Sequence, residues 1–253
     1  MPGTRTDHEA AVDSLDEAFR SEGRPERAEQ EKRYLKSALH HHGVSVPVTR
    51  RLLKAWRARR ARFERATVRG FVDEAWSRGV HELRVAAVEQ LAHDAALLEP
   101  DDLAWLEQLL REARTWALVD PLAIHVVGGL CRAHPAVAPG VEGWATDHDF
   151  WLRRTALLVH LLPMRRGDAE ALEPFARVAE PLLGDREFFI RKAIGWVLRD
   201  RAKQLPDEVF EWLLERAPRA SGLTLREASK PLTETQRARL KAARGAASRA
   251  LMT

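Results

Sequence analysis

The chain has 253 residues, a mass of 28.6 kDa and 45% hydrophobic residues, which is enough to bury a sizeable core in one or two domains. It carries a formal net charge of +4, and only 7 of its 41 basic residues are lysines, which leaves 34 arginines. Arginine favours bidentate phosphate contacts, so a polyanion such as nucleic acid is a reasonable partner, although GC-rich coding would produce the same bias.

Several classes of protein and site are not expected. The single cysteine, Cys131, cannot form an internal disulfide, and no CxxC pair is present. No apolar run approaches the roughly 18 residues of a membrane span, and the polar N-terminus does not resemble a signal peptide. No phosphate-binding loop, GxSxG or HExxH motif occurs. We therefore expect a cytoplasmic protein that does not contact a membrane.

Apolar residues recur with helical spacing along almost the whole chain, whereas the alternation expected of strands is scarce. Pro100 with Asp101, and Pro206 with Asp207, are typical of places where helices begin. The sequence therefore predicts an all-α fold. The predicted helices cover residues 66–77, 82–92, 103–110, 116–130, 150–162, 171–183, 188–198 and 208–214.

Four of these segments have a charged residue at the same register. The segments are HELRVAAV (81–88), WALVDPLA (116–123), WLRRTALL (151–158) and FIRKAIGW (189–196). The aligned residues, Arg84, Asp120, Arg154 and Lys192, are separated by 36, 34 and 38 residues. Helix pairs that repeat at this interval are typical of an α-solenoid of HEAT or armadillo type. The second helices of such repeats line the concave surface, so we expect the four charges to cross a basic concave groove.

Because stacked repeats share one continuous core, we expect a single HEAT-like-repeat domain over residues 1–253. Residues 1–25 are predicted to contain an N-terminal helix, whose packing the sequence does not determine. Residues 233–253 are basic and are predicted to form a C-terminal helix followed by a frayed end.

Trp116, Asp120, Arg154 and Trp196 are the candidate site residues. Trp116 and Asp120 are four residues apart, so they share one face of a helix. A carboxylate and an arginine between two indoles are suited to a positively charged sugar or base in DNA. Each residue also has a structural interpretation. The tryptophans are then core residues, Asp120 is a cap or turn residue before Pro121, and Arg154 is a solvated or ion-paired side chain.

The segments TWALVD (115–120), DFWLRRTALL (149–158) and FFIRKAIGWVLR (188–199) resemble the DNA alkylation repair family of HEAT-like-repeat DNA glycosylases, as does YLKSALHHHGVSVPVTRRL (34–52). The resemblance extends over about residues 30–235. It implies a hydrolase of N-glycosyl bonds that excises cationic alkylated purines, such as 7-methylguanine and 3-methyladenine, from duplex DNA without flipping the base. It also implies that Asp120 is the catalytic carboxylate, that Trp116 and Trp196 flank the lesion, and that Arg154 contacts the DNA backbone.

The chemistry of cationic lesions suits these residues. An N3- or N7-alkylated purine carries a positive charge and leaves as a neutral base, so no general acid is obligatory. The sugar passes through an oxocarbenium-like state, which the carboxylate of Asp120 would stabilise while it orients the attacking water. The negative ring faces of Trp116 and Trp196 would attract the same charge. We expect a monofunctional enzyme, because nothing in the sequence indicates a Schiff-base lyase step. We also expect a monomer that uses no cofactor.

Further basic residues are predicted to contact the DNA backbone, namely Arg84, Lys192, Arg50 and Arg51. The last two belong to a dense arginine run that also includes Arg57, Arg59 and Arg60. Such a run is more typical of a solvated face, and phosphate contact is the alternative. His40, His41 and His42 are consecutive and do not share a helix face, so no metal site is expected.

Two other functions are compatible with the pattern. One is a non-catalytic HEAT-like protein that binds particular DNA structures. The presence of all three residues Trp116, Asp120 and Trp196 argues against it. The other is a protein-interaction scaffold, which would need an apolar or acidic concave face in place of one lined by basic residues.

Overall fold

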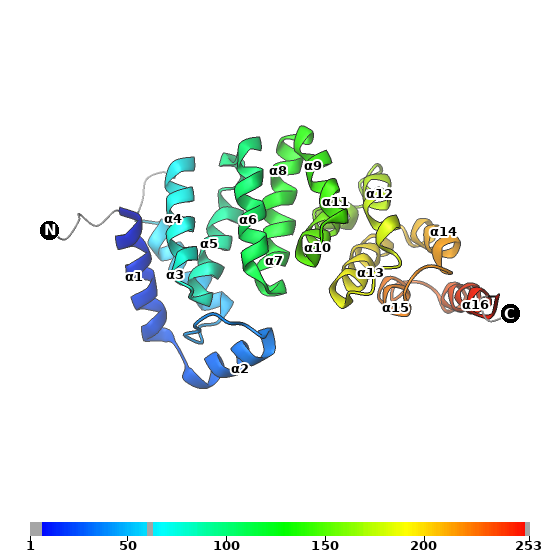
Figure 1. The fold of residues 1–253 in the computed structure, drawn as a ribbon, viewed down its shortest axis with the longest axis horizontal. Coiled ribbons are helices and arrows are strands. Elements are labelled where there is room, and N and C mark those ends of the chain that lie inside the picture. Colours follow the sequence, from blue (N-terminus) through cyan, green and yellow to red (C-terminus); the bar gives the residue numbers. More distant parts are fainter. Residues whose placement is uncertain (1–6, 60–62, 251–253) are drawn as a thin grey trace. The chain divides into compact units, whose positions relative to one another are not determined.

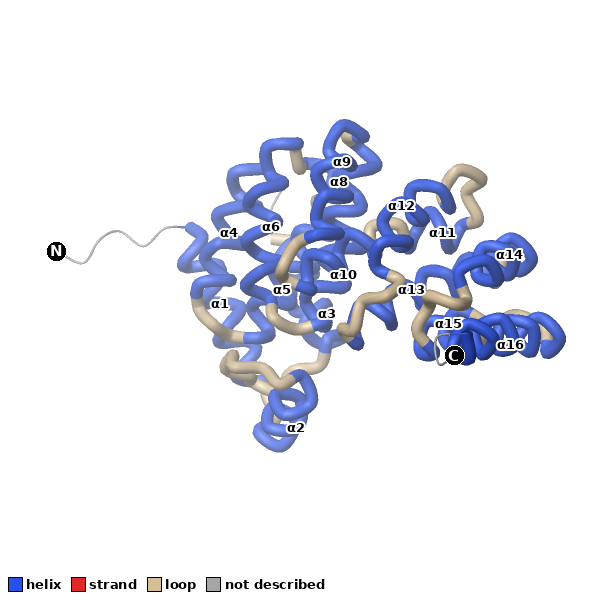
Figure 2. Tube along the Cα trace, turned by 45° about the vertical axis from the view of Figure 1, so that its right-hand side comes forward, coloured by secondary structure: helices blue, strands red, loops and turns tan. Residues whose placement is uncertain are grey.

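The computed structural model describes residues 7–59 and 63–250, and their regular structure is helical (Figures 1 and 2). No strand occurs among these described residues, in which an isolated bridge joins His40 to Val80. The all-α prediction is therefore confirmed. Arg60 of the arginine run, residues 1–6 of the segment 1–25 and residues 251–253 of the tail 233–253 lie outside the described residues.

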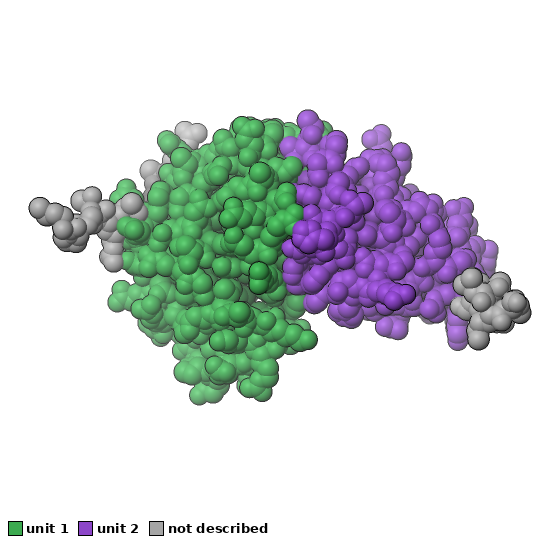
Figure 3. Space-filling model, in the orientation of Figure 1, with its two compact units in different colours: residues 1–135 green, residues 136–253 purple. Residues whose placement is uncertain are grey.

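The chain divides into two compact units, Met1–Pro135 and Ala136–Thr253 (Figure 3). Each unit has its own core of fully buried side chains. Phe19, Phe71 and Leu83 belong to the core of unit 1, and Leu152 and Phe175 belong to that of unit 2. The single domain expected over residues 1–253 stays a prediction.

Unit 1 is built from eight α-helices within its described residues. They are α1 (Asp7–Glu22), α2 (Pro25–Leu35), α3 (Val46–Arg57), α4 (Arg65–Ser77), α5 (His81–His93), α6 (Leu103–Ala113), α7 (Trp116–Pro121) and α8 (Gly128–Ala133). The 3-10 turns Ala95–Leu97 and Pro100–Asp102 precede α6, and a π-helical segment, Leu122–Val127, joins α7 to α8. Helix α4 packs against α1 and α5, and α5 also packs against α3 and α7. The N-terminal helix α1 belongs to this core, because it buries an apolar face that includes Val12 and Phe19.

Unit 2 contains α9 (Ala138–Gly143), α10 (Phe150–Leu158), α11 (Leu161–Arg166), α12 (Leu172–Leu182), α13 (Phe188–Ala202), α14 (Pro206–Arg216), α15 (Gly222–Ala228) and α16 (Glu234–Ala250). The 3-10 turns are Pro135–Val137, at the boundary between the units, and Trp144–Thr146. Helix α13 packs against α10, α11, α14 and α15 and is the central helix of the unit. Pro206 begins α14 as predicted, because proline has no N–H to leave unbonded in the first turn. The predicted C-terminal helix is α16.

Polar contacts recur at sequence separations close to the predicted repeat interval. In unit 1, Arg50 bonds Glu89 and Arg57 bonds Asp94, at separations of 39 and 37 residues. In unit 2, Arg165 bonds Asp200 at a separation of 35 residues. The contacts link α3 to the region of α5, and α11 to α13, so each joins segments that are two α-helices apart in chain order.

One apolar helical segment, Trp116–Ala133, has the length of a possible membrane span and a mean hydropathy of 1.2. The prediction that no apolar run approaches this length is therefore wrong. Leu118, Val119 and Leu130 of this segment are fully buried in the structure. Core helices pass the same test of length and composition, so the segment is weak evidence for a membrane.

Candidate functional site

A sharp turn between α6 and α7 places Trp116. Arg114 adopts a left-handed backbone conformation with φ of 48°, which ends α6. Thr115 then caps α7, because its side chain accepts a hydrogen bond from the N–H of Ala117 at 3.5 Å. Trp116 is the first residue of α7 and is 36% exposed. Its interpretation as a core residue is therefore wrong.

Asp120 lies one helical turn after Trp116 and is buried, with 8% exposure. It is inside α7 and is not the cap of a helix. Pro121 follows and has no N–H to donate, and the next six residues, Leu122–Val127, form a π-helical segment. The helix predicted over 116–130 therefore changes its winding directly after Pro121, at Leu122, which is two residues beyond Asp120 along the chain. Single π-helical turns within α-helices are frequent at functional sites.

Tyr34 is a neighbour of Trp116 that the sequence analysis did not single out. It lies in the last turn of α2, is 74% exposed, and meets Trp116 edge to face, with ring centroids 6.0 Å apart. Both rings line a cavity of about 230 Å³ that Glu31, Arg50 and His81 also line. The sequence signal for Tyr34 was its position at the start of the segment 34–52, which resembles the DNA alkylation repair family.

Arg154 and Trp196 belong to unit 2. Arg154 on α10 is 4% exposed, and its Nη1 donates a hydrogen bond to the carbonyl oxygen of Phe189 at 2.6 Å. Its guanidinium also lies 5.6 Å from the ring centroid of Phe189. Arg154 is therefore not a solvated side chain. Trp196 on α13 is half-buried and follows Gly195, where α15 approaches closely: a Cβ at Gly195 would lie 2.6 Å from that of Glu227.

Lys192 lies one turn before Trp196 on α13 and is exposed. Its Nζ is 5.7 Å from the ring centroid of Phe188, which is itself 52% exposed. A cation beside an exposed aromatic ring is a combination that proteins use to bind nucleic-acid strands. This position is compatible with the predicted backbone contact.

The other predicted backbone contacts differ in exposure. Arg50 and Arg51 on α3 are exposed and form ion pairs with Glu89 and Glu22, at 2.7 and 2.6 Å. The hydrogen bond to Glu89 raises the pKa of Arg50. Arg84 is half-buried, donates to the carbonyl oxygens of residues 112 and 76, and lies over the Trp76 ring; burial lowers its pKa. The surroundings of Arg84 thus favour a structural role, and its phosphate contact stays a prediction.

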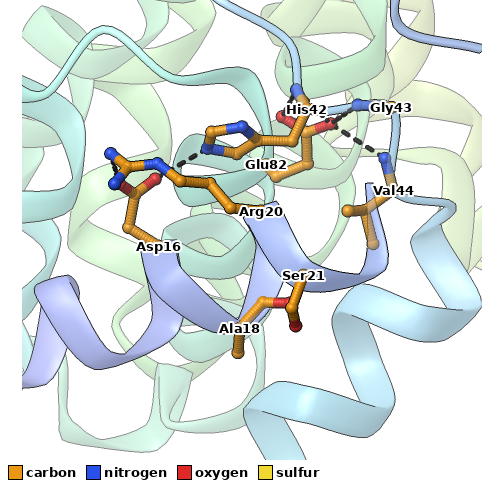
Figure 4. A network of polar contacts seen from close by, with 8 residues as sticks. All are labelled: Asp16, Ala18, Arg20, Ser21, His42, Gly43, Val44 and Glu82. Carbon is orange, nitrogen blue, oxygen red and sulfur yellow. Dashed lines mark hydrogen bonds and ion pairs between the residues drawn. The ribbon is translucent and has the colours of Figure 1, made fainter. Parts of the chain in front are cut away.

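The segment 40–44 leads into α3 and is not helical, so the argument from helix faces does not apply to its histidines. The carboxylate of Glu82 accepts hydrogen bonds from the N–H groups of residues 42, 43 and 44, and the His42 ring contacts Asp16 at 2.8 Å (Figure 4). His41 has a different environment: it lies beside Glu31 and His81, a group of three potential metal ligands within the described part of the chain. Burial, followed by the proximity of His41, lowers the pKa of His81 to about 4.

The chain matches the family model described as DNA alkylation repair enzyme over residues 15–232. No curated protein sequence matches it. Among solved structures, it is similar to one described as "Predicted DNA alkylation repair enzyme from Enterococcus faecalis", with a TM-score of 0.73 and 23% identity. That match covers 84% of this chain and 98% of the other, and at this identity it shows the fold alone. Because the family model covers most of the sequence, the chain belongs to the DNA alkylation repair enzyme family.

Proposed function

We propose that this chain is a DNA glycosylase that excises cationic alkylated purines, of the 7-methylguanine and 3-methyladenine type, from duplex DNA. The observation that carries the proposal is the arrangement on α7, where an exposed indole at the first residue, Trp116, is followed one turn later by a buried carboxylate, Asp120. Membership of a DNA alkylation repair family supports DNA as the substrate.

The reaction breaks the bond between C1′ of the sugar and the alkylated base, and the base leaves as a neutral molecule with the bonding electrons. Positive charge then develops on the sugar ring, where the carboxylate of Asp120 stabilises it. A water molecule adds to C1′ and gives up a proton, for which Asp120 is the general base. The exposed rings of Trp116 and Tyr34 offer faces that attract the cationic base or sugar. Trp196 is assigned the same role, and Arg154 is assigned a contact to the DNA backbone.

We further infer that the helices form HEAT-like repeats with a basic concave groove. The polar contacts at separations of 35 to 39 residues support a repeat, and they occur in both units. Each unit has exposed basic residues that support contacts to phosphates, Arg50 and Arg51 in unit 1 and Lys192 in unit 2.

Release of bases from DNA treated with a methylating agent tests the catalytic role. Asp120→Asn is nearly isosteric and should lower the excision rate about 10²–10³-fold, as does the loss of other preorganised electrostatic groups. Thermal unfolding and affinity for undamaged duplex should stay close to wild type. Asp73→Asn is a suitable control, because this exposed carboxylate on α4 accepts a bond from Trp105 that an amide oxygen preserves. A wild-type rate for Asp120→Asn would remove Asp120 from the mechanism.

Duplexes that each carry one defined lesion test the selectivity. If the enzyme acts on charge and on the sugar, cationic N3- and N7-adducts should be excised even when they are bulky, whereas uracil and hypoxanthine should remain. Efficient release of a neutral base would contradict the proposal. DNA binding without release of any base by the wild type would favour the non-catalytic DNA-binding protein.

A further inference from the structure

Glu31, His41 and His81 come together in unit 1 from three different segments. Glu31 is on α2, His81 is the first residue of α5, and His41 lies in the connection from α2 to α3. Their potential ligand atoms all lie within 4.8 Å of one another. Nδ1 of His41 is 3.8 Å from Oε2 of Glu31, and the two imidazoles are stacked with centroids 4.3 Å apart and an angle of 11° between their planes.

The polar atoms of this cluster are buried and lack hydrogen-bond partners. They are Oε2 of Glu31, both ring nitrogens of His41 and Nδ1 of His81. His41 is 6% exposed and His81 is 3% exposed. Buried polar side-chain atoms in proteins nearly always have a partner, and each exception requires an explanation. One atom from each of the three side chains can bind the same ion, and all are electron-pair donors to metals, so the cluster points to a bound cation.

The backbone around the cluster is firmly held. The N–H of His81 donates to the carbonyl oxygen of His40 at 2.8 Å. The next residue, Glu82, binds the three N–H groups that directly follow His41, at distances from 2.7 to 3.1 Å (Figure 4). Hydrogen bonds that fix the segments carrying metal ligands are a regular feature of metal sites, because they limit the rearrangement that binding requires.

We propose that Glu31, His41 and His81 bind one Zn²⁺ ion, with solvent as the fourth ligand. Two imidazoles and one carboxylate form a known zinc ligand set, and imidazole suits first-row divalent ions better than it suits Mg²⁺ or Ca²⁺. Zinc–ligand bonds of about 2.0–2.2 Å place tetrahedral ligand atoms roughly 3.3–3.5 Å apart. The most distant pair of ligand atoms, at up to 4.8 Å, must therefore approach by roughly 1.4 Å. One imidazole must also turn about its Cβ–Cγ bond, because the lone pairs of parallel rings do not converge.

The ion would link α2 to α5. This structural role goes beyond the proposed glycosylase activity. The buried residues of α2 are Ala28 and Leu35, so few apolar side chains hold this helix in place. Figure 1 shows α2 at the edge of the other unit 1 helices. Tyr34, which meets Trp116, is on the last turn of α2, and Glu31 is three residues before it. A bond from Glu31 to a metal held by His81 would fix the position of Tyr34.

The test uses the full chain after treatment with EDTA and removal of any histidine tag. Titration with ZnCl₂, followed by calorimetry, should give one ion per chain and raise the melting temperature. Co²⁺ in place of Zn²⁺ should give the intense visible absorption of a tetrahedral site. Hydrogen exchange should slow in residues 25–35 when Zn²⁺ is present, because α2 becomes anchored.

Two variants and one control complete the experiment. Glu31→Gln and His81→Gln should each weaken Zn²⁺ binding at least 10-fold and abolish the shift in melting temperature. Glu31 is half-buried and its amide is nearly isosteric, so this variant is expected to fold even if His81→Gln does not. His148→Gln removes a histidine whose side chain is 91% exposed and should bind like wild type. Failure of the wild type to bind Zn²⁺, or equal binding by Glu31→Gln and wild type, would overturn the proposal. Neither result depends on glycosylase activity.

Discussion

Replacement of Glu82 by glutamine is expected to lower the free energy of unfolding by about 3–5 kcal/mol, although it changes neither the size nor the shape of the side chain. Glu82 is 1% exposed, and its carboxylate is the acceptor for three successive backbone N–H groups (Figure 4). Oε1 accepts from Gly43 at 2.7 Å and from Val44 at 3.0 Å, and Oε2 accepts from His42 at 3.0 Å.

The magnitude follows from these bonds. Hydrogen bonds to a charged group contribute about 1.5–3 kcal/mol each, and neutral ones about 0.5–1.5 kcal/mol. The amide oxygen of glutamine retains the bonds from Gly43 and Val44 but loses about 1 kcal/mol at each. The amide NH₂ replaces Oε2 beside the N–H of His42, which keeps its 3.1 Å contact with the amide oxygen at Oε1. A buried N–H donor in the place of an acceptor costs about 1–3 kcal/mol. The sum is about 3–5 kcal/mol.

Urea denaturation and hydrogen exchange measure this effect. The urea concentration at the midpoint of unfolding should fall, with little change in the dependence of the free energy of unfolding on urea concentration. The amides of residues 42–44 should exchange hydrogen faster. Glu89→Gln is the matched control, because Glu89 is two turns further along α5 and its partner Arg50 is exposed, so that ion pair contributes about 1 kcal/mol or less. A loss below about 1 kcal/mol for Glu82→Gln would refute the assignment of Glu82 as the anchor of this segment.

Three further changes have expected outcomes. Gly195→Ala should destabilise unit 2 by about 1–3 kcal/mol in urea denaturation, because its Cβ would lie 2.6 Å from that of Glu227, and it should lower activity by displacing Trp196. Burial lowers the pKa of His160 to about 4 from an ordinary 6.5, so its neutral form stabilises the fold above pH 6.5 and this stability is lost as the pH falls toward 4. His160→Leu should therefore reduce the loss of unfolding free energy between pH 7.5 and 4.5 by about 2 kcal/mol. Trp116→Ala should abolish most base release but destabilise the fold less than the loss of a buried tryptophan, because Trp116 is 36% exposed.

Each of these changes has a control in the same chain. Gly184→Ala should be neutral, because a Cβ there has no atom within 4 Å. His148→Gln should leave the free energy of unfolding at pH 7.5 unchanged, because this side chain is 91% exposed. Trp151→Ala removes a tryptophan that is 7% exposed and should cost about 3–5 kcal/mol. Equal destabilisation by Trp116→Ala and Trp151→Ala would contradict the placement of Trp116 at the surface.

The helical class could be predicted because the period of the apolar residues is a local property of the sequence. Pro206 begins α14 as expected for the same reason, since the lack of an N–H is a property of one residue. The division of the predicted helix 116–130 into α7, a π-helical segment and α8 was not predicted. Pro121 was visible in the sequence, but the winding that follows it depends on how the neighbouring helices pack.

The candidate site was accessible from the sequence only in part. The spacing of Trp116 and Asp120 predicted a shared helix face, but not that one side chain is exposed and the other buried. The contact of Tyr34 with Trp116 joins residues 82 positions apart, and no local pattern predicts such a contact. Arg84 shared a register with Asp120, yet its guanidinium bonds to backbone carbonyl oxygens, because register does not determine where a long side chain turns.

The surroundings of His40, His41 and His42 could not be predicted from the local sequence either. Their consecutive positions were interpreted as if they lay on a helix, whereas the segment is not helical and His41 and His42 have different partners. The approach of His81, 40 residues further along, depends on the bridge between the segment and the start of α5.

The difference in burial between Trp116 and Asp120 affects the expected rate of base excision. A carboxylate 4 Å from a unit positive charge gains about 1 kcal/mol in water and about 4 kcal/mol at the effective dielectric of a protein surface. The difference of about 3 kcal/mol corresponds to a rate factor of about 10², the lower end of the loss expected for Asp120→Asn. Under the proposed mechanism, Asp120 would obtain this factor, because it is only 8% exposed. A carboxylate at the exposed first residue of α7 would be screened by solvent, whereas an indole there keeps its attraction for a cation pressed against its face.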